Sequence, residues 1–164
     1  MAMKPTQWIW HNGEMVPWGQ ATTHVTSHAL HYGSSVFEGI RAYATPAGMA
    51  VFRLGDHLDR LFESARIYRM ESKFDKAQLR EACHQAIRDN GLAKGAYLRP
   101  IIYRGAGELG VMPGPSVPID IAIVAIEWGS LLGEASLERG VDVCVSSWQR
   151  AAANTFPMMA KAGG

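Results

Sequence analysis

Two helix-length segments follow one another in the middle of the chain, between two groups of strand-like segments. Across 57–69, and again between Asp75 and Gly91, apolar side chains recur every three or four residues, the period of an amphipathic helix. Asp56 and Asp75 are suitable N-caps. Because the helices come as a pair and do not alternate with strands, we expect an α+β fold with a mostly antiparallel sheet and two packed helices. The apolar stripes are Leu58, Leu61, Phe62 and Ala65, then Leu79, Ala82, Cys83, Ala86 and Ile87.

Turn signals divide the strand-like segments. Asn12-Gly13 supplies two residues that tolerate positive φ, which predicts a tight hairpin turn. A second hairpin is predicted around Thr45-Pro46-Ala47-Gly48. A loop rich in glycine and proline is expected over 105–118. The predicted strands are 7–11, 14–18, 36–43, 49–53, 96–103 and 119–128.

The C-terminal part of the chain predicts the start of a second domain. A strand as apolar as the one expected from Val141 to Ser147 needs neighbours on both sides. Residues 157–162 resemble the start of a helix. The few residues after Gly140 are too short to bury a core of their own, so we expect their apolar face to be covered by something else. The expected divisions are an N-terminal domain at 1–128, a connector with a little helix at 129–140, and the beginning of a second domain at 141–164.

Composition narrows the class of protein. Sixteen Lys and Arg against fifteen Asp and Glu give a net charge of +1 over 164 residues, which provides no basic face for nucleic acid. The uncharged run 121–126 is too short to span a bilayer, and residues 1–7 contain no apolar signal segment. Cys83 and Cys144 each lie in an apolar run, which favours reduced thiols. We therefore expect a cytoplasmic enzyme or binding domain.

Two sequence patterns could indicate a ligand site, but each also has a structural interpretation. Residues 105–110 match G-x-G-x-x-G, but two prolines soon follow and forbid the helix that would receive a phosphate, which favours a loop. His24, His28 and His31 have the spacing of one helix face and could hold zinc. The residues between them are poor helix formers, which favours histidines in structural hydrogen bonds.

Four polar side chains each have two interpretations. Arg60 lies one turn after Asp56, so it either pairs with that carboxylate or offers a guanidinium fork to a phosphate or carboxylate. Tyr97 and Arg99 share one strand face, where an arginine implies either a carboxylate pocket or an internal ion pair. Lys161 lies among apolar residues, where a lysine is either simply solvated or kept uncharged and nucleophilic.

Taken together, these residues resemble a known family. Residues 27–43, SHALHYGSSVFEGIRAY, closely resemble the signature of branched-chain amino-acid aminotransferases, which are pyridoxal-phosphate (PLP) enzymes of fold type IV. The resemblance continues through most of the chain. Its further segments are Phe52-Arg-x-x-x-His57-x-x-Arg60-Leu, Ala96-Tyr-Leu-Arg-Pro100, Leu109-Gly-Val111, Ser146-Ser-Trp-x-Arg-Ala-Ala-x-Asn-Thr155 and Ala160-Lys-Ala-Gly-Gly164.

The resemblance implies transfer of the amino group between leucine, isoleucine or valine and 2-oxoglutarate in a homodimer or a multiple of dimers. Lys161 would hold PLP as an internal aldimine and move the proton at Cα, and Arg60 would contact the PLP phosphate. Tyr97 would contact the substrate α-carboxylate, and Arg99 would receive the distal carboxylate of glutamate. The walls of the side-chain pocket would be Phe37, Trp128 and, from the partner subunit, Tyr32 and Val111.

Two departures from the family pattern leave alternatives open. Ser130-Leu131 stand where the family often has an aromatic residue, so one pocket wall is expected to be aliphatic. The sequence stops three residues after Lys161, so we expect the C-terminal half of the family's site to be missing and this chain alone to be inactive or nearly so. The alternatives are another fold-type-IV enzyme, such as a D-amino-acid transaminase or an aminodeoxychorismate lyase, a non-catalytic interaction domain, and a three-histidine metal protein.

Overall fold

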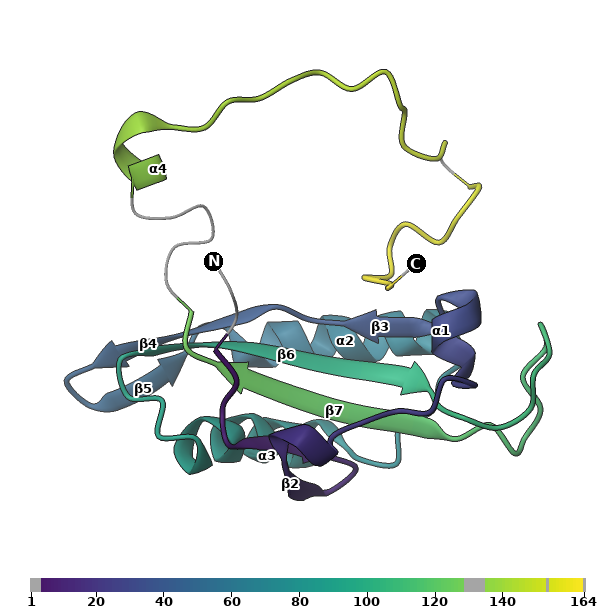
Figure 1. The fold of residues 1–164 in the computed structure, drawn as a ribbon, viewed down its shortest axis with the longest axis horizontal. Coiled ribbons are helices and arrows are strands. Elements are labelled where there is room, and N and C mark those ends of the chain that lie inside the picture. The colour runs from purple at the N-terminus through teal and green to yellow at the C-terminus, as the bar shows by residue number, and fades with distance from the viewer. Residues whose placement is uncertain (1–3, 129–134, 153, 164) are drawn as a thin grey trace.

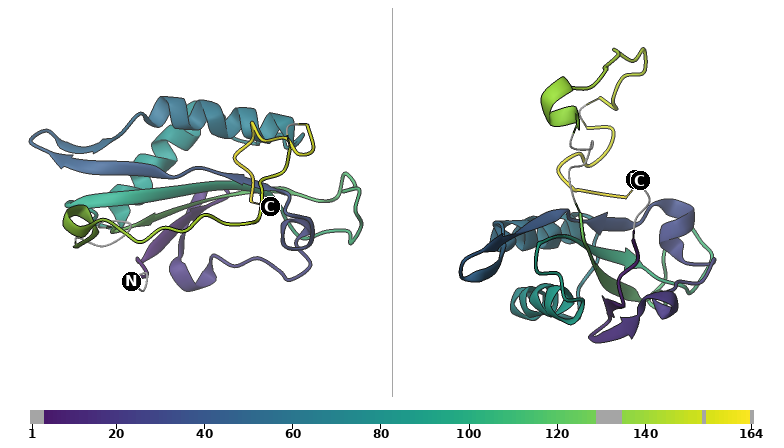
Figure 2. Two further views of the ribbon diagram at one scale, coloured as in Figure 1. Left: turned by 90° about the horizontal axis from the view of Figure 1, so that it is seen from above. Right: turned by 60° about the vertical axis from the view of Figure 1, so that its left-hand side comes forward.

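The computed structural model describes residues 4–128, 135–152 and 154–163. Helices α2 and α3 lie together against one face of the sheet (Figures 1 and 2). No helix within the described ranges is long and apolar enough to cross a membrane. In chain order the elements are β1 (Trp8–His11), β2 (Glu14–Pro17), a 3-10 turn (Trp18–Gln20), α1 (His28–Tyr32), β3 (Ser35–Phe37), β4 (Ile40–Thr45), β5 (Gly48–Val51), α2 (Leu54–Ile67), α3 (Lys76–Asp89), β6 (Gly95–Arg104), β7 (Ile119–Ile126) and α4 (Ala135–Arg139).

The described strands form one sheet in the order β2-β1-β7-β6-β4-β5, with β3 also paired to β6. Every pairing is antiparallel. The predicted α+β class, the two hairpins and the helix pair are therefore confirmed. The hairpin turn between β1 and β2 places Asn12 at φ 49° and Gly13 at φ 110°, as the Asn-Gly signal predicts.

The predicted strand 36–43 is interrupted at Glu38 and Gly39, which separate β3 from β4. Both halves keep one register against β6, since Phe37 lies opposite Ile101 and Ile40 opposite Leu98. The main chain of Glu38 donates to the Pro100 carbonyl at 2.9 Å. Proline has no N–H to return that bond, so the ladder breaks at this pair without a change of face.

The two helices begin differently. Asp75 caps α3 with a capping box, in which its carboxylate accepts from the Gln78 N–H and the Gln78 side chain accepts from the Asp75 N–H. The prediction that Asp56 caps α2 is wrong, because the N-cap is Arg53 in a left-handed conformation at φ 47°. Asp56 instead lies in the first turn, where its charge suits the helix dipole and its carboxylate accepts from Arg53.

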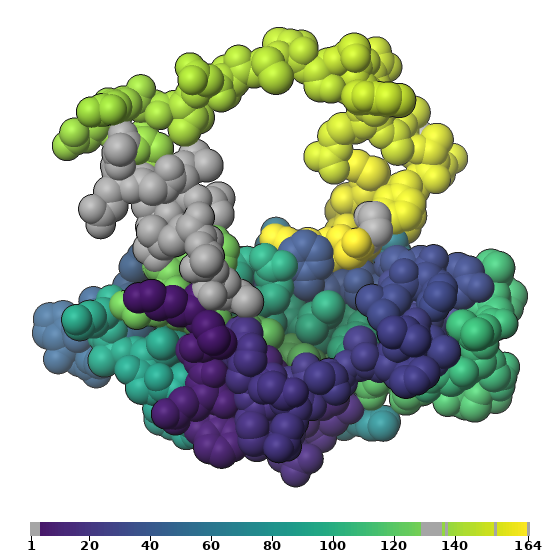
Figure 3. Space-filling view, in the orientation of Figure 1, coloured from purple at the N-terminus to yellow at the C-terminus, as the bar shows by residue number. Residues whose placement is uncertain are grey.

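The C-terminal segment leaves the sheet and returns to it. Residues 140–152 run in an extended path without strand pairing and stand off the sheet (Figure 3). Residues 157–163 come back to β3, where Ala162 forms a bridge to Val36. The predicted strand 141–147 is therefore not formed, because a strand needs a partner that these residues do not have here. Val143 and Val145 are 88% and 101% exposed. Residues 157–162 make turns and one isolated bridge instead of the predicted helix. Part of the predicted connector, 129–134, lies outside the described residues.

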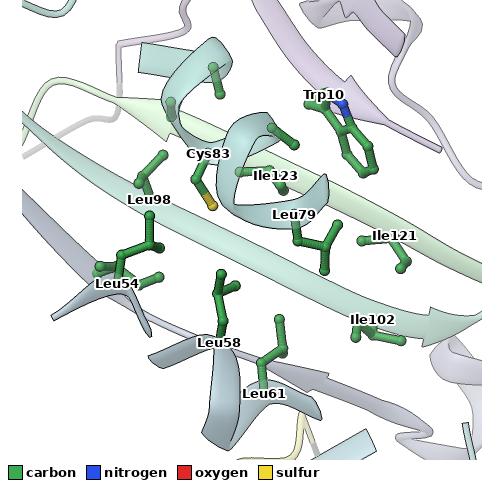
Figure 4. Packing of buried hydrophobic residues seen from close by; sticks show 14 of the residues in the cluster. Trp10, Leu54, Leu58, Leu61, Leu79, Cys83, Leu98, Ile102, Ile121 and Ile123 are labelled. Carbon is green, nitrogen blue, oxygen red and sulfur yellow. The ribbon is translucent and has the colours of Figure 1, made fainter. Parts of the chain in front are cut away.

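The hydrophobic core lies between the helices and the sheet (Figure 4). Leu58 and Leu61 of α2 and Leu79 and Cys83 of α3 are almost completely buried. They meet the even-numbered residues of β6, such as Leu98 and Ile102, and the inward residues of β7. The odd-numbered positions of β6 face the opposite side of the sheet. Tyr97 and Arg99 lie on that second face.

Candidate active site

A buried carboxylate, Glu38, joins the break between β3 and β4 to helix α2. Its side chain is 0% exposed. Arg60 donates to it through two nitrogens, Nε to Oε1 and Nη2 to Oε2, the latter at 2.8 Å. His57 Nδ1, one turn earlier on α2, donates to Oε2 at 2.9 Å, and Lys161 Nζ lies 4.0 Å from the same oxygen. One carboxylate is thus surrounded by three nitrogen-bearing side chains from two separate parts of the chain.

The surroundings of Glu38 keep it ionised. Burial by itself raises the pKa of the carboxyl group, because removal from water disfavours the charged form. The hydrogen bonds from Arg60 and His57, with the charges of Arg60 and Lys161, act in the opposite direction and are stronger together. The pKa of Glu38 therefore lies below its ordinary value of 4.5. The hydrogen bond to Glu38 likewise raises the pKa of Arg60.

Lys161 is held by its main chain. Its carbonyl accepts from the Phe37 N–H at 3.0 Å, and its own N–H donates to the Ser64 hydroxyl on α2 at 3.1 Å. The next residues extend the pairing, with Ala162 bridged to Val36 in an antiparallel sense. The Lys161 ammonium nitrogen lies 5.4 Å from the centre of the Phe37 ring. The returning segment therefore adds to the free edge of β3 and fixes the position from which the amine projects.

A second group of side chains lies on the face of the sheet away from the helices. Arg99 donates to the Tyr97 hydroxyl through Nε at 3.2 Å and Nη2 at 2.6 Å. The Arg99 guanidinium lies 4.6 Å from the centre of the Phe37 ring. The Tyr97 ring is 4.9 Å from that of Trp128. None of the ion pairs found within the described residues involves Arg99, so the interpretation of an internal ion pair is not realised there.

Gly39 leaves room for the Tyr97 side chain. It lies next to Glu38 on the interrupted strand, and the register places it opposite Arg99. A Cβ atom at position 39 would overlap the Tyr97 hydroxyl. The hydroxyl can therefore reach its position beside Arg99 only because residue 39 has no side chain.

An open pocket connects Arg60 with Lys161. Its volume is about 490 Å³, and Arg150, Phe156 and Met159 also line it. Three of its lining side chains carry cationic groups, whereas Glu38 is buried beneath Arg60 and Lys161 and does not line it. The pocket therefore favours an anionic ligand with an apolar part.

Tyr32 and Val111 belong to neither of these two groups. Tyr32 ends helix α1 and is 44% exposed, and Val111 is 76% exposed in the loop after β6. His28 links the two segments, because its Nε2 donates to the Gly110 carbonyl at 3.0 Å and its Nδ1 accepts from the Ser34 hydroxyl at 2.7 Å. Of the eight predicted site residues, the structure thus gathers Phe37, Tyr97, Arg99 and Trp128 on one face, places Arg60 and Lys161 around Glu38, and leaves Tyr32 and Val111 exposed.

The competing interpretations of the sequence have different outcomes. The pairing of Arg60 with Asp56 is wrong, since Arg60 binds Glu38 and Asp56 binds Arg53. No helix follows the glycine-rich loop at 105–110 directly. His24 bonds to Thr26 and His31 to the Val25 carbonyl, and within the described residues no three metal-ligating side chains gather at one point.

Sequence reasoning missed Glu38 and its partner His57. A signal was present, because Glu38 alternates with Val36 and Ile40 on the buried face of a strand. A carboxylate at such a position requires buried cationic or hydrogen-bonding partners. The sequence could have predicted that such partners exist. It could not identify them, because α2 lies about twenty residues further along the chain.

The chain is similar in sequence and in fold to known proteins. A branched-chain-amino-acid aminotransferase of Escherichia coli strain K12 is 51% identical over 164 residues, which are 100% of this chain and 53% of the relative. A T.th. branched-chain amino acid aminotransferase solved with pyridoxamine 5'-phosphate matches with a TM-score of 0.90 and 46% identity, over 99% of this chain and 52% of that one. The same enzyme complexed with N-(5'-phosphopyridoxyl)-L-glutamate gives a TM-score of 0.88 and 44% identity, over 99% and 51%.

The chain spans about half the length of these relatives. The sequence model described as "Amino-transferase class IV" matches residues 35–164. That range contains Glu38 with its neighbours Arg60 and Lys161. It also contains Arg99, which lies on the face of the sheet away from the helices. This chain belongs to the class IV aminotransferase family.

Proposed function

We propose that this chain forms the N-terminal half of a PLP-dependent enzyme that transfers the amino group between branched-chain L-amino acids and 2-oxoglutarate. The observation that carries the proposal is the common placement of Arg60 and Lys161, which line one pocket and approach one buried carboxylate. The names of the relatives and the ligands in the titles of the two T.th. structures support the same reaction and cofactor.

The residues of the pocket fit a phosphorylated cofactor. Arg60 uses Nε and Nη2 to bind Glu38, and its side chain remains 51% exposed, so a guanidinium edge is available to a phosphate oxygen. Lys161 offers a primary amine on the same pocket. When bound, PLP supplies the electron-withdrawing ring that stabilises negative charge at the substrate Cα.

The chain's own residues perform three tasks in this proposal. Arg60 binds the phosphate and so fixes one end of the cofactor. Lys161 Nζ would hold the cofactor through its amine and would then act as general base and acid, taking the proton from the substrate Cα and giving it to a carbon of the cofactor. The main-chain bonds of Lys161 to Phe37 and Ser64 hold that amine at a fixed edge of the sheet.

In this proposal, the substrate is recognised on the face of the sheet away from the helices. Phe37 and Trp128 provide apolar surface for leucine, isoleucine or valine side chains. Tyr97 binds the α-carboxylate, and the Arg99 guanidinium beside it accepts the distal carboxylate of glutamate. An apolar pocket with one guanidinium at its edge can take both substrates in turn.

The rest of the site comes from other chain segments. We propose that a segment equivalent to the unmatched half of the relatives follows residue 164 and covers the exposed Val143 and Val145, so that 141–164, after the connector at 129–140, begins a large domain and 1–128 forms the small domain. The partner subunit's Tyr32 and the partner subunit's Val111 complete the side-chain pocket in a homodimer or a multiple of dimers. We place this enzyme in the cytoplasm.

The test is an amino-transfer assay on the product of the complete gene. With added PLP, leucine and 2-oxoglutarate should yield glutamate. Turnover of D-alanine without leucine turnover would instead indicate another fold-type-IV enzyme, and the absence of both activities, with no PLP uptake, would indicate a non-catalytic interaction domain. The 164-residue chain alone should show no appreciable turnover. Robust activity of that chain, with its mass confirmed, would contradict the need for a second half.

A further inference from the structure

We propose that Glu38 is a positioning residue that holds the Arg60 guanidinium by one edge so that its other edge meets a phosphate monoester. The role deepens the proposed function and rests on it, because the phosphate is that of PLP. Glu38 itself lies beneath the pocket and touches neither cofactor nor substrate in this account.

The hydrogen-bond pattern shows which edge of the Arg60 guanidinium is bound to Glu38 and which edge is free. Nε and Nη2 lie on the same edge of the guanidinium, and both bind the Glu38 carboxylate. Within the described residues Nη1 has no hydrogen-bond partner, and Arg60 lines the pocket. A two-point contact fixes the plane of a guanidinium as well as its position, which a single contact does not. The free edge is therefore set before any ligand arrives.

The burial of Glu38 makes this contact rigid. Its side chain is completely buried, and His57 donates a further hydrogen bond to the oxygen that accepts from Arg60 Nη2. The Glu38 main chain is also fixed, because its N–H donates to the Pro100 carbonyl. By contrast, Glu63 makes the same kind of contact with Arg66 elsewhere on α2, but both side chains are more than half exposed. The two pairs differ in burial, so Glu63 is a matched control.

Two opposing effects decide the experiment. Loss of the carboxylate would free the full charge of Arg60 for a phosphate, which would tighten binding. It would also release the guanidinium from its fixed plane, which would weaken binding. The positioning account requires the second effect to dominate, since a long arginine side chain loses considerable rotamer freedom when it binds.

The main measurement compares two ligands in the product of the complete gene. In Glu38→Gln the dissociation constant for PLP should rise by roughly tenfold to a hundredfold, the value of a charge-assisted hydrogen bond. The dissociation constant for pyridoxal, which lacks the phosphate, should stay within about twofold. Glu63→Gln should change neither. An unchanged or tighter PLP affinity, or an equal loss for both ligands, would overturn the proposal.

Two further measurements cover a folding failure and a failure of the proposed function. Glu38→Asp keeps the charge but shortens the reach, so it should show the same selective loss of PLP. If Glu38→Asp bound PLP as tightly as the wild type does, the charge of the carboxylate alone would matter, which would contradict the positioning role. In cofactor-free protein, inorganic phosphate should protect Arg60 from phenylglyoxal, as read by peptide mass, and Glu38→Gln should abolish that protection. This experiment tests the positioning role of Glu38 even if the wild-type protein takes up no PLP. In that case only the proposed function is wrong. Protection that persists in the variant would overturn the role of Glu38.

Discussion

The main-chain N–H of Phe37 donates a hydrogen bond of 3.0 Å to the carbonyl of Lys161. One hydrogen bond thereby joins the strand next to Glu38 to the returning C-terminal segment. The centre of the Phe37 ring also lies 5.4 Å from the Lys161 amine and 4.6 Å from the Arg99 guanidinium. Phe37 therefore connects the residues around Glu38 with those on the face of the sheet away from the helices.

The Arg99 guanidinium should decide between substrates. Arg99→Met should lower kcat/KM for glutamate by about tenfold more than kcat/KM for leucine, because only glutamate has a second carboxylate to bind. The two half-reactions can be followed separately by absorbance of the bound cofactor. Arg104→Met is the control, since Arg104 lies on the same strand but donates to the carbonyls of Tyr68 and Arg69. An equal loss for both amino acids would contradict this role.

The missing side chain at Gly39 should control the Tyr97 hydroxyl. Gly39→Ala should displace that hydroxyl and raise KM for amino-acid substrates by roughly tenfold, with PLP affinity unchanged. The overlap should also lower the free energy of unfolding by about 1–3 kcal/mol. Gly19→Ala, where nothing lies near the added methyl group, should alter neither quantity. Normal KM values in Gly39→Ala would show that the hydroxyl does not need its present position.

Acid should remove the stabilisation that Glu38 provides. Its pKa in the folded protein lies below 4.5, so the unfolded chain binds more protons at low pH and stability falls as the pH falls. The difference in free energy of unfolding between wild type and Glu38→Gln should be on the order of 3 kcal/mol above about pH 4.5. It should shrink as the pH drops through the lowered pKa. A difference that grows in acid would contradict the ionised, paired state. Glu63→Gln should change stability little at any pH, because solvent screens that pair.

The capping box at Asp75 should stabilise α3. Asp75→Ala removes the acceptor for the Gln78 N–H and should lower the free energy of unfolding in urea by about 1 kcal/mol. Asp89→Ala, at the other end of the helix on an exposed face, should change it by less than about 0.5 kcal/mol. Equal effects of the two substitutions would mean that the cap contributes nothing of its own.

Local patterns were sufficient for most elements of the fold. Asn12-Gly13, the capping residue Asp75 and the apolar stripes of the helices each act within a few residues, so the sequence predicts them directly. The start of α2 was wrong because Arg53 adopts a left-handed conformation that its residue type does not suggest. The interruption of the strand at Glu38 depends on Pro100, a residue far along the chain, and only the pairing with β6 reveals it.

The candidate site also combines residues that the sequence identified with long-range partners that it did not. The resemblance named Arg60, Arg99 and Lys161, but the local spacing of Arg60 favoured Asp56 as its partner. The actual partner, Glu38, is brought to α2 by the sheet. Likewise, the strand at 141–147 was predicted from its own apolar residues, whereas a strand also requires a neighbour to pair with. Long-range partners are what the sequence alone could not supply.

The most direct test of the central claim is to identify the lysine that carries the cofactor. The product of the complete gene is loaded with PLP, reduced with borohydride and digested, and its peptides are weighed. The account predicts a single pyridoxyl-modified peptide that contains Lys161, and none in Lys161→Ala. Label spread over exposed lysines such as Lys4, Lys73, Lys76 and Lys94, or no label at Lys161, would contradict it.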